Sequence, residues 1–473
     1  MNRIFTFFVF VAFVFTASAQ DVKLTEIWHH STRSTATDLG GGTWLEGTPP
    51  EWMGGTTERS MVTANGNVYV ASRKNGQEIV VINPETGEFE KAMQLPSDVV
   101  NGGLFPVNCV AATESGDLVI ATLTTNTQGV DSLGVALPSS FFKAYHVELT
   151  ETKDSIANIE TIINWNNVGD TINPSFRIGD GMTFYGDLAD GTDGYLAVAA
   201  AGTDYILRWN ATNGVMDSVP QMFHAATSNP APAEGSAVNF ATAPQVTPVN
   251  EDLLIVDGNN LFPAVYDLAS EDPMAVEMVA TFDTIVHPQT PNLNGCDYFE
   301  FKGRQFIVAV TNYWNTGLEG VPPNSFEVFE LINGDWAQAV SLGFVPADGL
   351  SATNATKNVS FAYPASVDVQ QDTAFIYVMS ANMGIAKYAL SLVPTGIQDA
   401  FAKDDVRIYP NPATSVIRFS KKMENVMIFD ISGRKVKEAI NVEQMNVTEL
   451  RGLYIVNATD ERGDRTVQKL IVQ

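Results

Sequence analysis

One strand pattern recurs through most of this chain and restricts it to an all-β fold. Between Thr25 and Val393, short β-branched or aromatic runs alternate with Gly, Asn or Asp turns, and helical periodicity is nearly absent. The strongest runs lie at residues 67–72, 78–83, 117–122, 194–199, 252–256, 304–310 and 373–379. Most of these runs are separated by intervals of roughly 40 to 65 residues, which is typical of a repeat architecture.

This interval predicts the blades of a β-propeller. A four-stranded blade cannot bury both of its faces alone, so it needs a neighbour on each side around a ring. Several strong runs are followed by a partner strand, at residues 205–209, 264–268, 326–330 and 386–390. We count six blades, and seven blades or a pair of β-sandwiches remain alternatives.

The two ends of the repeat region predict how the ring closes. The last blade, from about residue 365 to residue 392, is one strand short, and residues 24–30 at the start form one strand in excess. Pairing these segments completes the last blade and protects two sheet edges at once. We therefore expect the first strand to lie in the last blade.

Composition restricts the classes of ligand. The chain has 473 residues, of which 45% are hydrophobic and 17% charged, so it can bury more than one core. Its formal net charge is -27, and essentially all of this excess lies in residues 20–402. Such a surface repels phosphate backbones and anionic headgroups, which argues against binding of nucleic acid or a lipid surface.

The first 19 residues have the pattern of a signal peptide. Arg3 precedes an apolar core at residues 4–15, and Ala17, Ser18 and Ala19 form a small-x-small cleavage pattern. The mature chain is expected to begin at Gln20. No later stretch is apolar over the length that a membrane-spanning helix needs.

Aromatic residues on loops are candidates for ligand binding. Trp52, Tyr313 and Trp314 are flanked by Gly, Pro or Asn, and aromatic faces above a rigid scaffold can stack on sugars. The alternative is that these rings pack between blades.

A second candidate is a Gly-rich segment with three carboxylates. Asp187, Asp190 and Asp193 supply the hard oxygen ligands that Ca²⁺ prefers, although their spacing differs from that of a 12-residue calcium loop. A simple Asp/Gly hairpin turn is the alternative. No other cofactor is predicted.

The sequence leaves enzymatic activity undecided. It contains no Gly-x-Ser-x-Gly elbow, no His-Glu-x-x-His motif, no phosphate loop and no cluster of Cys and His. A pair of carboxylates assembled across blades would need no local motif. Cys109 and Cys296, the only cysteines, are consistent with a single bridge or with two buried thiols.

The last 68 residues change in pattern and in charge. Residues 406–413 read Val-Arg-Ile-Tyr-Pro-Asn-Pro-Ala, and short strands with Gly turns follow, which predicts a small β-sandwich. This segment closely resembles the type A sorting domain of type IX secretion. The matching positions are Tyr409, Pro410, Asn411, Pro412, Asp430, Gly433, Arg434, Gly452, Tyr454 and Lys469.

The resemblance implies a route and a set of partners. The chain would pass the Sec translocon and the type IX outer-membrane translocon, and a sortase-like peptidase would remove the tail. The product would be secreted or attached to the outer-membrane surface after periplasmic transit.

The middle of the chain resembles a family of exported propellers of unknown function that occur alongside sugar-utilisation proteins. The similarity depends on residues 57–61, Thr-Glu-Arg-Ser-Met, and on residues 181–187, Gly-Met-Thr-Phe-Tyr-Gly-Asp. It transfers no catalytic residue.

These observations predict four segments and a function class. We expect a signal peptide at 1–19, a propeller at 20–395, a linker at 396–405 and the sorting domain at 406–473. The propeller is expected to be a binding module for extracellular glycan or peptide, and the alternative is an extracellular hydrolase or lyase that acts on polysaccharide at the propeller channel.

Overall fold

The structure is a computed structural model of the whole chain. It describes residues 20–33, 47–125, 141–166, 177–225, 240, 242–259, 261–270, 273, 276–281, 292–293, 295–310, 322, 324–351, 365–394, 406, 408–431, 433–460 and 465–473. The predicted signal peptide and the whole of the predicted linker lie outside these residues. Contacts divide the chain into two compact units, Leu24–Ser391 and a second unit that contains Leu392–Gln473.

The first half of the larger unit contains three antiparallel sheets, which we number as blades 1 to 3 in chain order. Blade 1 consists of β2 (Ser60–Ala64), β3 (Asn67–Ser72), β4 (Glu78–Ile82) and β5 (Phe89–Gln94). Blade 2 consists of β6 (Phe105–Ala112), β7 (Leu118–Thr125), β8 (Phe142–Leu149) and β9 (Ile156–Trp165), and short β10 (Arg177–Ile178) pairs with β7. Blade 3 consists of β11 (Thr183–Gly186), β12 (Gly194–Ala199), β13 (Tyr205–Thr212), β14 (Val215–Met216) and β15 (Gln221–His224).

The second half contains blades 4 to 6. Blade 4 consists of β16 (Thr242–Pro248), β17 (Leu253–Asn259), β18 (Leu261–Asp267) and β19 (Glu277–Thr281), and β20 (Asn292–Leu293) pairs with β17. Blade 5 consists of β21 (Cys296–Phe301), β22 (Arg304–Val310), β23 (Phe326–Leu331) and β24 (Ala339–Val345), with two short 3-10 turns, η2 (Ile332–Gly334) and η3 (Trp336–Gln338), before β24. Blade 6 consists of β25 (Ala365–Val369), β26 (Ala374–Ser380), β27 (Gly384–Pro394) and β1 (Gln20–Ser31).

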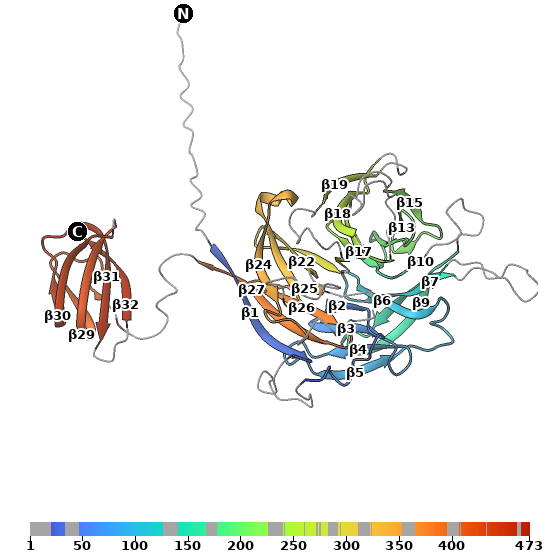
Figure 1. Ribbon diagram of the computed structural model, residues 1–473, viewed down its shortest axis with the longest axis horizontal. Coiled ribbons are helices and arrows are strands. Elements are labelled where there is room, and N and C mark those ends of the chain that lie inside the picture. Colours follow the sequence, from blue (N-terminus) through green and yellow to red (C-terminus); the bar gives the residue numbers. More distant parts are fainter. Residues whose placement is uncertain are drawn as a thin grey trace, which may run out of the picture. The chain divides into compact units, whose positions relative to one another are not determined.

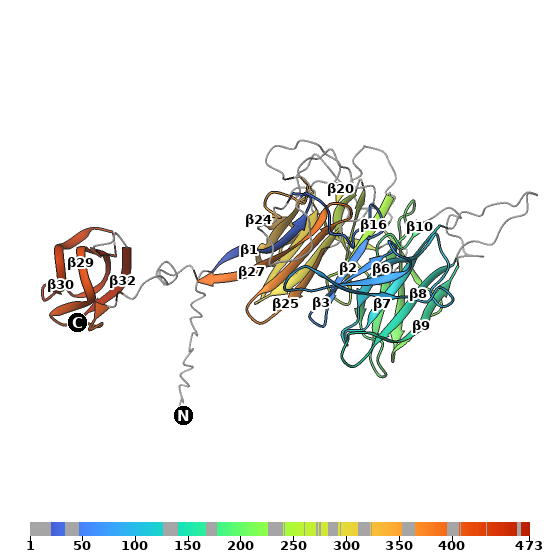
Figure 2. The ribbon, with the colours of Figure 1, turned by 90° about the horizontal axis from the view of Figure 1, so that it is seen from below.

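The six blades form a ring. The innermost strands contact one another in the order β2, β6, β11, β16, β21 and β25, and β25 returns to β2. Figure 1 shows the sheets following one another around a common centre. The predicted six-bladed propeller is therefore confirmed, and so is its closure, because β1 pairs with β27 and lies beside it in both views (Figure 1, Figure 2).

Strand β4 shows why the blades need neighbours on both sides. Ile79 and Val81 pack in a cluster with blade 2, whereas Val80 and Ile82 point to the other face and pack in a cluster with blade 6. All four side chains are at most 2% exposed. Burying each one contributes about 1.5–3 kcal/mol, so a continuous apolar run is stable only between two other sheets.

Three contacts join the first and last strands of the ring to blade 1. Trp28 of β1 donates a hydrogen bond from Nε1 to the Pro84 carbonyl at 3.0 Å, and Lys387 of β27 donates from Nζ to the same oxygen at 2.8 Å. The Trp28 ring also lies against Gly87, where a Cβ atom would come within 2.7 Å of it. The turn after β4 thus holds blade 6 closed.

The C-terminal unit is a curled sheet around its own core. Its strands are β28 (Ile408–Tyr409), β29 (Val416–Asp430), β30 (Lys435–Asn446), β31 (Gly452–Asp460) and β32 (Arg465–Val472). Strand β29 pairs with β28, β30 and β31, and register shifts within it let the long strand bend. Alternate side chains, such as Ile417, Phe419, Val426 and Ile428, enter one shared cluster.

The two cysteines do not form a bridge. Cys109 lies on β6 and Cys296 on β21, and both are free and buried. Among the described residues, no helix is long and apolar enough to cross a membrane.

Candidate functional site

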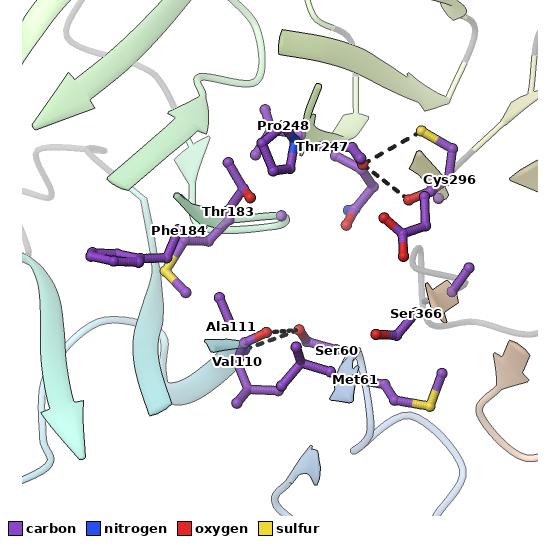
Figure 3. Close-up of a pocket in the computed structure, with 18 of the residues that line it drawn as sticks. Ser60, Met61, Val110, Ala111, Thr183, Phe184, Thr247, Pro248, Cys296 and Ser366 are labelled. Carbon is purple, nitrogen blue, oxygen red and sulfur yellow. Dashed lines mark hydrogen bonds between the residues drawn. The ribbon is translucent and has the colours of Figure 1, made fainter. Parts of the chain in front are cut away.

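The centre of the ring contains a channel with a cavity of about 300 Å³. Every innermost strand contributes to its wall, and Figure 3 shows side chains from all around the ring converging on it. Because the strands of each blade are antiparallel and each blade begins at its innermost strand, all six innermost strands run in the same direction. We call the end at which they begin the upper mouth.

Small hydroxyl groups tie the innermost strands together. The Ser60 hydroxyl donates to the Val110 carbonyl at 3.0 Å and accepts from the Val110 amide at 2.9 Å, which joins blades 1 and 2. Thr63 and Ser366 lie 2.9 Å apart, hydroxyl to hydroxyl, and join blades 1 and 6. Thr247 donates to the Cys296 carbonyl at 3.0 Å and joins blades 4 and 5 (Figure 3). These residues satisfy strand edges that would otherwise stay unpaired along the channel.

One side of the upper mouth contains two unusual carboxyl groups. Asp297, the second residue of β21, lines the cavity, and burial raises its pKa to about 7 although the Tyr298 amide donates to it at 2.9 Å. Asp257 of β17 is fully buried, and burial raises its pKa to about 8. It lies opposite Gln245, a lining residue, in the strand register. Both acids therefore retain much of their proton near neutral pH.

A thiol lies beside these acids. Burial, followed by the charge of Asp257, raises the pKa of Cys296 well above its ordinary value, so the thiol is neutral. Its Sγ lies 3.5 Å from the Thr247 hydroxyl. A neutral buried thiol is a poor nucleophile, and we assign Cys296 a packing role.

The other side of the upper mouth is basic. Arg59, immediately before β2, lines the cavity, and its Nη1 lies 3.6 Å from Asp180 Oδ1. Arg177 contacts both oxygens of Asp180, from Nε at 2.6 Å and from Nη2. Arg73 donates to the Asn108 side chain at 3.1 Å and stacks on Phe105, with its guanidinium carbon 4.1 Å from the ring centre.

The aromatic candidates fall in different places. Trp52 is 8% exposed and packs in the cluster that joins blades 6 and 1, so little of its ring face is available to a ligand. Tyr313 and Trp314 lie outside the described residues. Of the aromatic residues described, only Phe184 lines the cavity.

The three acids of the Gly-rich segment are not brought together. Asp187 accepts hydrogen bonds from the Ser115 hydroxyl at 3.0 Å and from the Leu188 amide at 2.7 Å, whereas Asp193 accepts from the Asn213 amide at 3.0 Å. Asp190 is exposed. In the part of the chain that the structure describes, no group of three or more His, Cys, Asp or Glu residues could hold a metal ion.

The matched positions of the tail lie at its turns and strand ends. Asn411 donates to the Lys469 carbonyl at 2.6 Å and accepts from the Ile471 amide at 2.9 Å, which fastens the Pro-Asn-Pro segment to β32. The bonds from Tyr409 to Pro410 and from Asn411 to Pro412 are cis.

The other matched positions shape two turns. Asp430 accepts from the Arg434 amide at 3.0 Å across a turn in which Gly433 has a φ of 83°. Tyr454 donates to the Arg451 carbonyl at 2.9 Å beside Gly452, whose φ is 102°. The tail motifs therefore build the fold of the tail.

A serine and a histidine on β1 resemble part of a hydrolase triad. Ser31 Oγ lies 2.6 Å from His29 Nε2, and Glu26 lies 3.9 Å from the other ring nitrogen. Ser31 is 0% exposed, so no substrate can reach its hydroxyl. The pair therefore stabilises the closing strand.

Sequence reasoning alone missed Asp257, Asp297 and Gln245. Asp257 follows the apolar run Leu-Leu-Ile-Val at the end of a strong strand, and an acid in that position is a detectable sign of burial. Asp297 and Gln245 have no comparable local sign.

Comparisons with known proteins support both units. Residues 407–473 match the family model described as the secretion system C-terminal sorting domain. A search of curated proteins finds no match. Among solved structures, a DUF4623 family protein from Bacteroides eggerthii is 14% identical, with a TM-score of 0.50 over 72% of this chain and 71% of that chain.

Two further structures are more distant. The soluble aldose sugar dehydrogenase from Escherichia coli is 10% identical, with a TM-score of 0.39 over 78% of this chain and 99% of that one. A Trypanosoma rangeli sialidase in complex with sialic acid is 9% identical, with a TM-score of 0.37 over 96% of this chain and 89% of that one.

The fold and the tail together establish a general class. The chain is a β-propeller exported by type IX secretion, because the sorting domain implies passage across the outer membrane to the cell surface or the medium.

Proposed function

We propose that this exported propeller is a binding module that holds the end unit of an extracellular glycan in the upper mouth of its channel. The observation that carries the proposal is the cavity of about 300 Å³, to whose wall all six blades contribute and which combines hydroxyl, amide, carboxyl and guanidinium side chains from every blade except blade 2. This volume is at the lower end of the range for ligand pockets, about 300–1,000 Å³, so it suits one sugar ring rather than a long chain.

The chemistry of the wall favours a sugar over an apolar side chain. Thr183, Gln245 and Thr247 offer hydrogen-bonding groups from neighbouring blades, and a sugar ring presents hydroxyl groups around its whole edge. An apolar peptide side chain offers no hydrogen bond to Thr183 or Gln245, and a buried polar group left unsatisfied costs about 1–3 kcal/mol, whereas Thr247 already donates to the Cys296 carbonyl.

Stacking at the entrance remains part of the proposal. Tyr313 and Trp314 fall in sequence between Val310 and Phe326, the paired ends of β22 and β23. By strand direction, these ends lie on the side of the upper mouth. A further unit of the glycan could stack there.

A glycan and peptide array on the full chain tests the proposal, followed by calorimetry with the strongest ligand. Gln245→Ala should weaken binding about tenfold because it removes a lining amide. Gln338→Ala, at an exposed position on η3, is the matched control and should bind as the parent does. If the protein binds no glycan on the array, or binds peptides but no glycan, the proposal is wrong.

One observation favours a second candidate, an extracellular hydrolase or lyase acting on polysaccharide. Asp297 faces the cavity with a pKa of about 7, which is the range that a general acid needs, and Asp257 lies on the neighbouring blade. Release of new sugar ends from acidic and neutral polysaccharides by the full chain, with loss of that activity in Asp297→Asn, would support the enzyme. Absence of product from both proteins would exclude it for the substrates tested.

A further inference from the structure

One carboxyl group in the wall of the cavity has no cation beside it among the described residues. Asp297 lines the cavity and is partly exposed. Two backbone groups donate hydrogen bonds to it, the Tyr298 amide at 2.9 Å and the Val367 amide of blade 6. A carboxylate has about four acceptor positions, so Asp297 can accept further hydrogen bonds from a group in the cavity.

The described part of the wall stabilises the charged form of Asp297 only through these two amides. Burial raises its pKa to about 7, and the amides oppose this rise only in part. The acid therefore keeps its proton for part of the time at neutral pH. A positively charged group that enters the cavity would supply the missing stabilisation and favour the carboxylate.

A second acid adds to the negative potential on this side. Asp257 of β17 is 0% exposed, and the Cys296 thiol and the Gly295 amide approach its carboxyl group. Burial, and then the charges of Asp257 and Asp297, raise the pKa of Cys296, which places both acids near the same thiol. Among the described residues, no Lys, Arg or His acts on either carboxyl group. The formal net charge of -27 also attracts cations toward the protein.

Arg59, which lines the opposite side of the cavity, does not neutralise Asp297. Arg59 is 8% exposed, and its Nη1 lies 3.6 Å from Asp180 Oδ1. Its charge acts on Arg73 and Cys109 but not on Asp297. The two groups are therefore too far apart to pair across the cavity. A cation in the cavity would meet Asp297 without competition from Arg59.

We infer that the sugar unit held in the upper mouth carries a free amino group, and that Asp297 binds this ammonium. The inference rests on the proposed function and names its ligand class, a glycan that ends in a hexosamine without an acetyl group. An ammonium has three donors and no acceptor, so it fits the acceptor positions that the backbone leaves on Asp297. Thr183 and Gln245 line the same cavity and offer hydrogen bonds to hydroxyl groups of the same ring (Figure 3).

The experiment uses the full chain and calorimetry at pH 7, where a free amine still carries most of its charge. The probes are oligosaccharides that end in glucosamine, galactosamine or mannosamine. Each probe is compared with its N-acetyl form and with the sugar that has a hydroxyl group in place of the amine. At least one amine should bind about tenfold to hundredfold more tightly than both neutral partners, as expected for a hydrogen bond between charged groups.

The comparison with the hydroxyl sugar decides, because an acetyl group changes size as well as charge. A peptide with a free lysine is the further probe, since its ammonium offers the same charge without the sugar ring. It should bind more weakly than the preferred amino sugar, because it lacks the hydroxyl groups that Thr183 and Gln245 can contact.

Three variants assign the preference to one residue. Asp297→Asn should remove the preference for the amine, and Asp297→Glu should retain part of it, because the longer side chain keeps the charge. Glu277→Gln is the matched control, because it removes one acid at an exposed position on β19, outside the cavity wall. It should bind as the parent does. Melting curves check that all three variants fold.

The outcomes separate this inference from the proposed function. Equal binding of the amine and the hydroxyl sugar by the parent would overturn the inference and leave the binding module intact. The same holds if the preference for the amine persists in Asp297→Asn, or if the lysine peptide binds more tightly than every amino sugar. Binding of no glycan would overturn both. If Asp297→Asn fails to fold, the comparison of amine with hydroxyl sugar on the parent protein still decides.

Discussion

The closing contact of the ring allows a quantitative prediction. Trp28 is 3% exposed, and its ring lies near Tyr377, with 6.1 Å between ring centres, and against Gly87. Replacing it with Ala leaves a cavity between β1 and blade 1. The rest of the seam stays in place, because the Pro84 carbonyl keeps the hydrogen bond from Lys387 at 2.8 Å and is not left unsatisfied.

The expected loss follows from the buried ring alone. Replacing a buried Trp with Ala costs about 3–5 kcal/mol through lost burial and the cavity that remains. A propeller of about 370 residues unfolds with an entropy of about 0.8 kcal/mol/K near its melting temperature. Trp28→Ala should therefore lower the melting temperature by about 4–6 °C.

Scanning calorimetry of the full chain measures this shift. The C-terminal unit has its own core, so its transition should not move and can act as an internal reference. Trp336→Ala is the matched control, because Trp336 is only partly buried on η3 and should cost clearly less. A shift below about 1 °C for Trp28→Ala, or one no larger than that of Trp336→Ala, would refute the role of this contact in closure.

Three further predictions concern the seam, the buried acid and the tail. Gly87→Ala should lower the melting temperature, because the φ of Gly87 is 74° and the new Cβ would lie 2.7 Å from the Trp28 ring. The double variant with Trp28→Ala should lose less than the sum of the losses in the two single variants, and strict additivity would count against the clash. Burial raises the pKa of Asp257 from 3.8 to about 8, so the folded state keeps a proton that the unfolded state loses, and stability falls as pH rises from about 4 to 8. Asp257→Asn should remove this fall. The melting temperature of the variant should therefore rise relative to that of the parent as the pH increases across this window, and a difference that stays constant with pH would contradict the assignment. Fusion of residues 403–473 to a signal-peptide-bearing reporter in a type IX-competent host should direct the reporter outside the cell, and retention in the periplasm would refute the sorting role.

The fold was predictable because burial on both faces leaves a recognisable trace. Runs such as 79–82 lack polar alternation over a length too short for a buried helix, and their recurrence indicates stacked sheets. The closing strand was predictable by counting, since one segment was in excess and one blade was short. The pairs formed by β10 and β20 were not, because each strand has two residues and so shows no period.

The tail was predictable for a different reason. Its matched positions are those that the fold itself needs, such as the left-handed Gly433 and Gly452 and the bridging side chain of Asn411. Residues that build turns must stay at fixed spacing along the chain. A local motif is therefore enough to identify this unit.

The channel has no such motif, because its wall takes a few residues from each of six blades. Asp257 and Asp297 lie one repeat apart in sequence and on neighbouring blades in space. Among the 54 acidic residues, Asp257 is marked only by the apolar run before it, and Asp297 has no local sign at all. The ring makes both unusual by removing water from them. A lining residue such as Asp297 faces a cavity on one side, so its identity is less restricted by packing than that of Ile79 or Val80. In a propeller the strand pattern therefore specifies the ring, whereas ligand choice depends on scattered positions that the strand pattern does not determine.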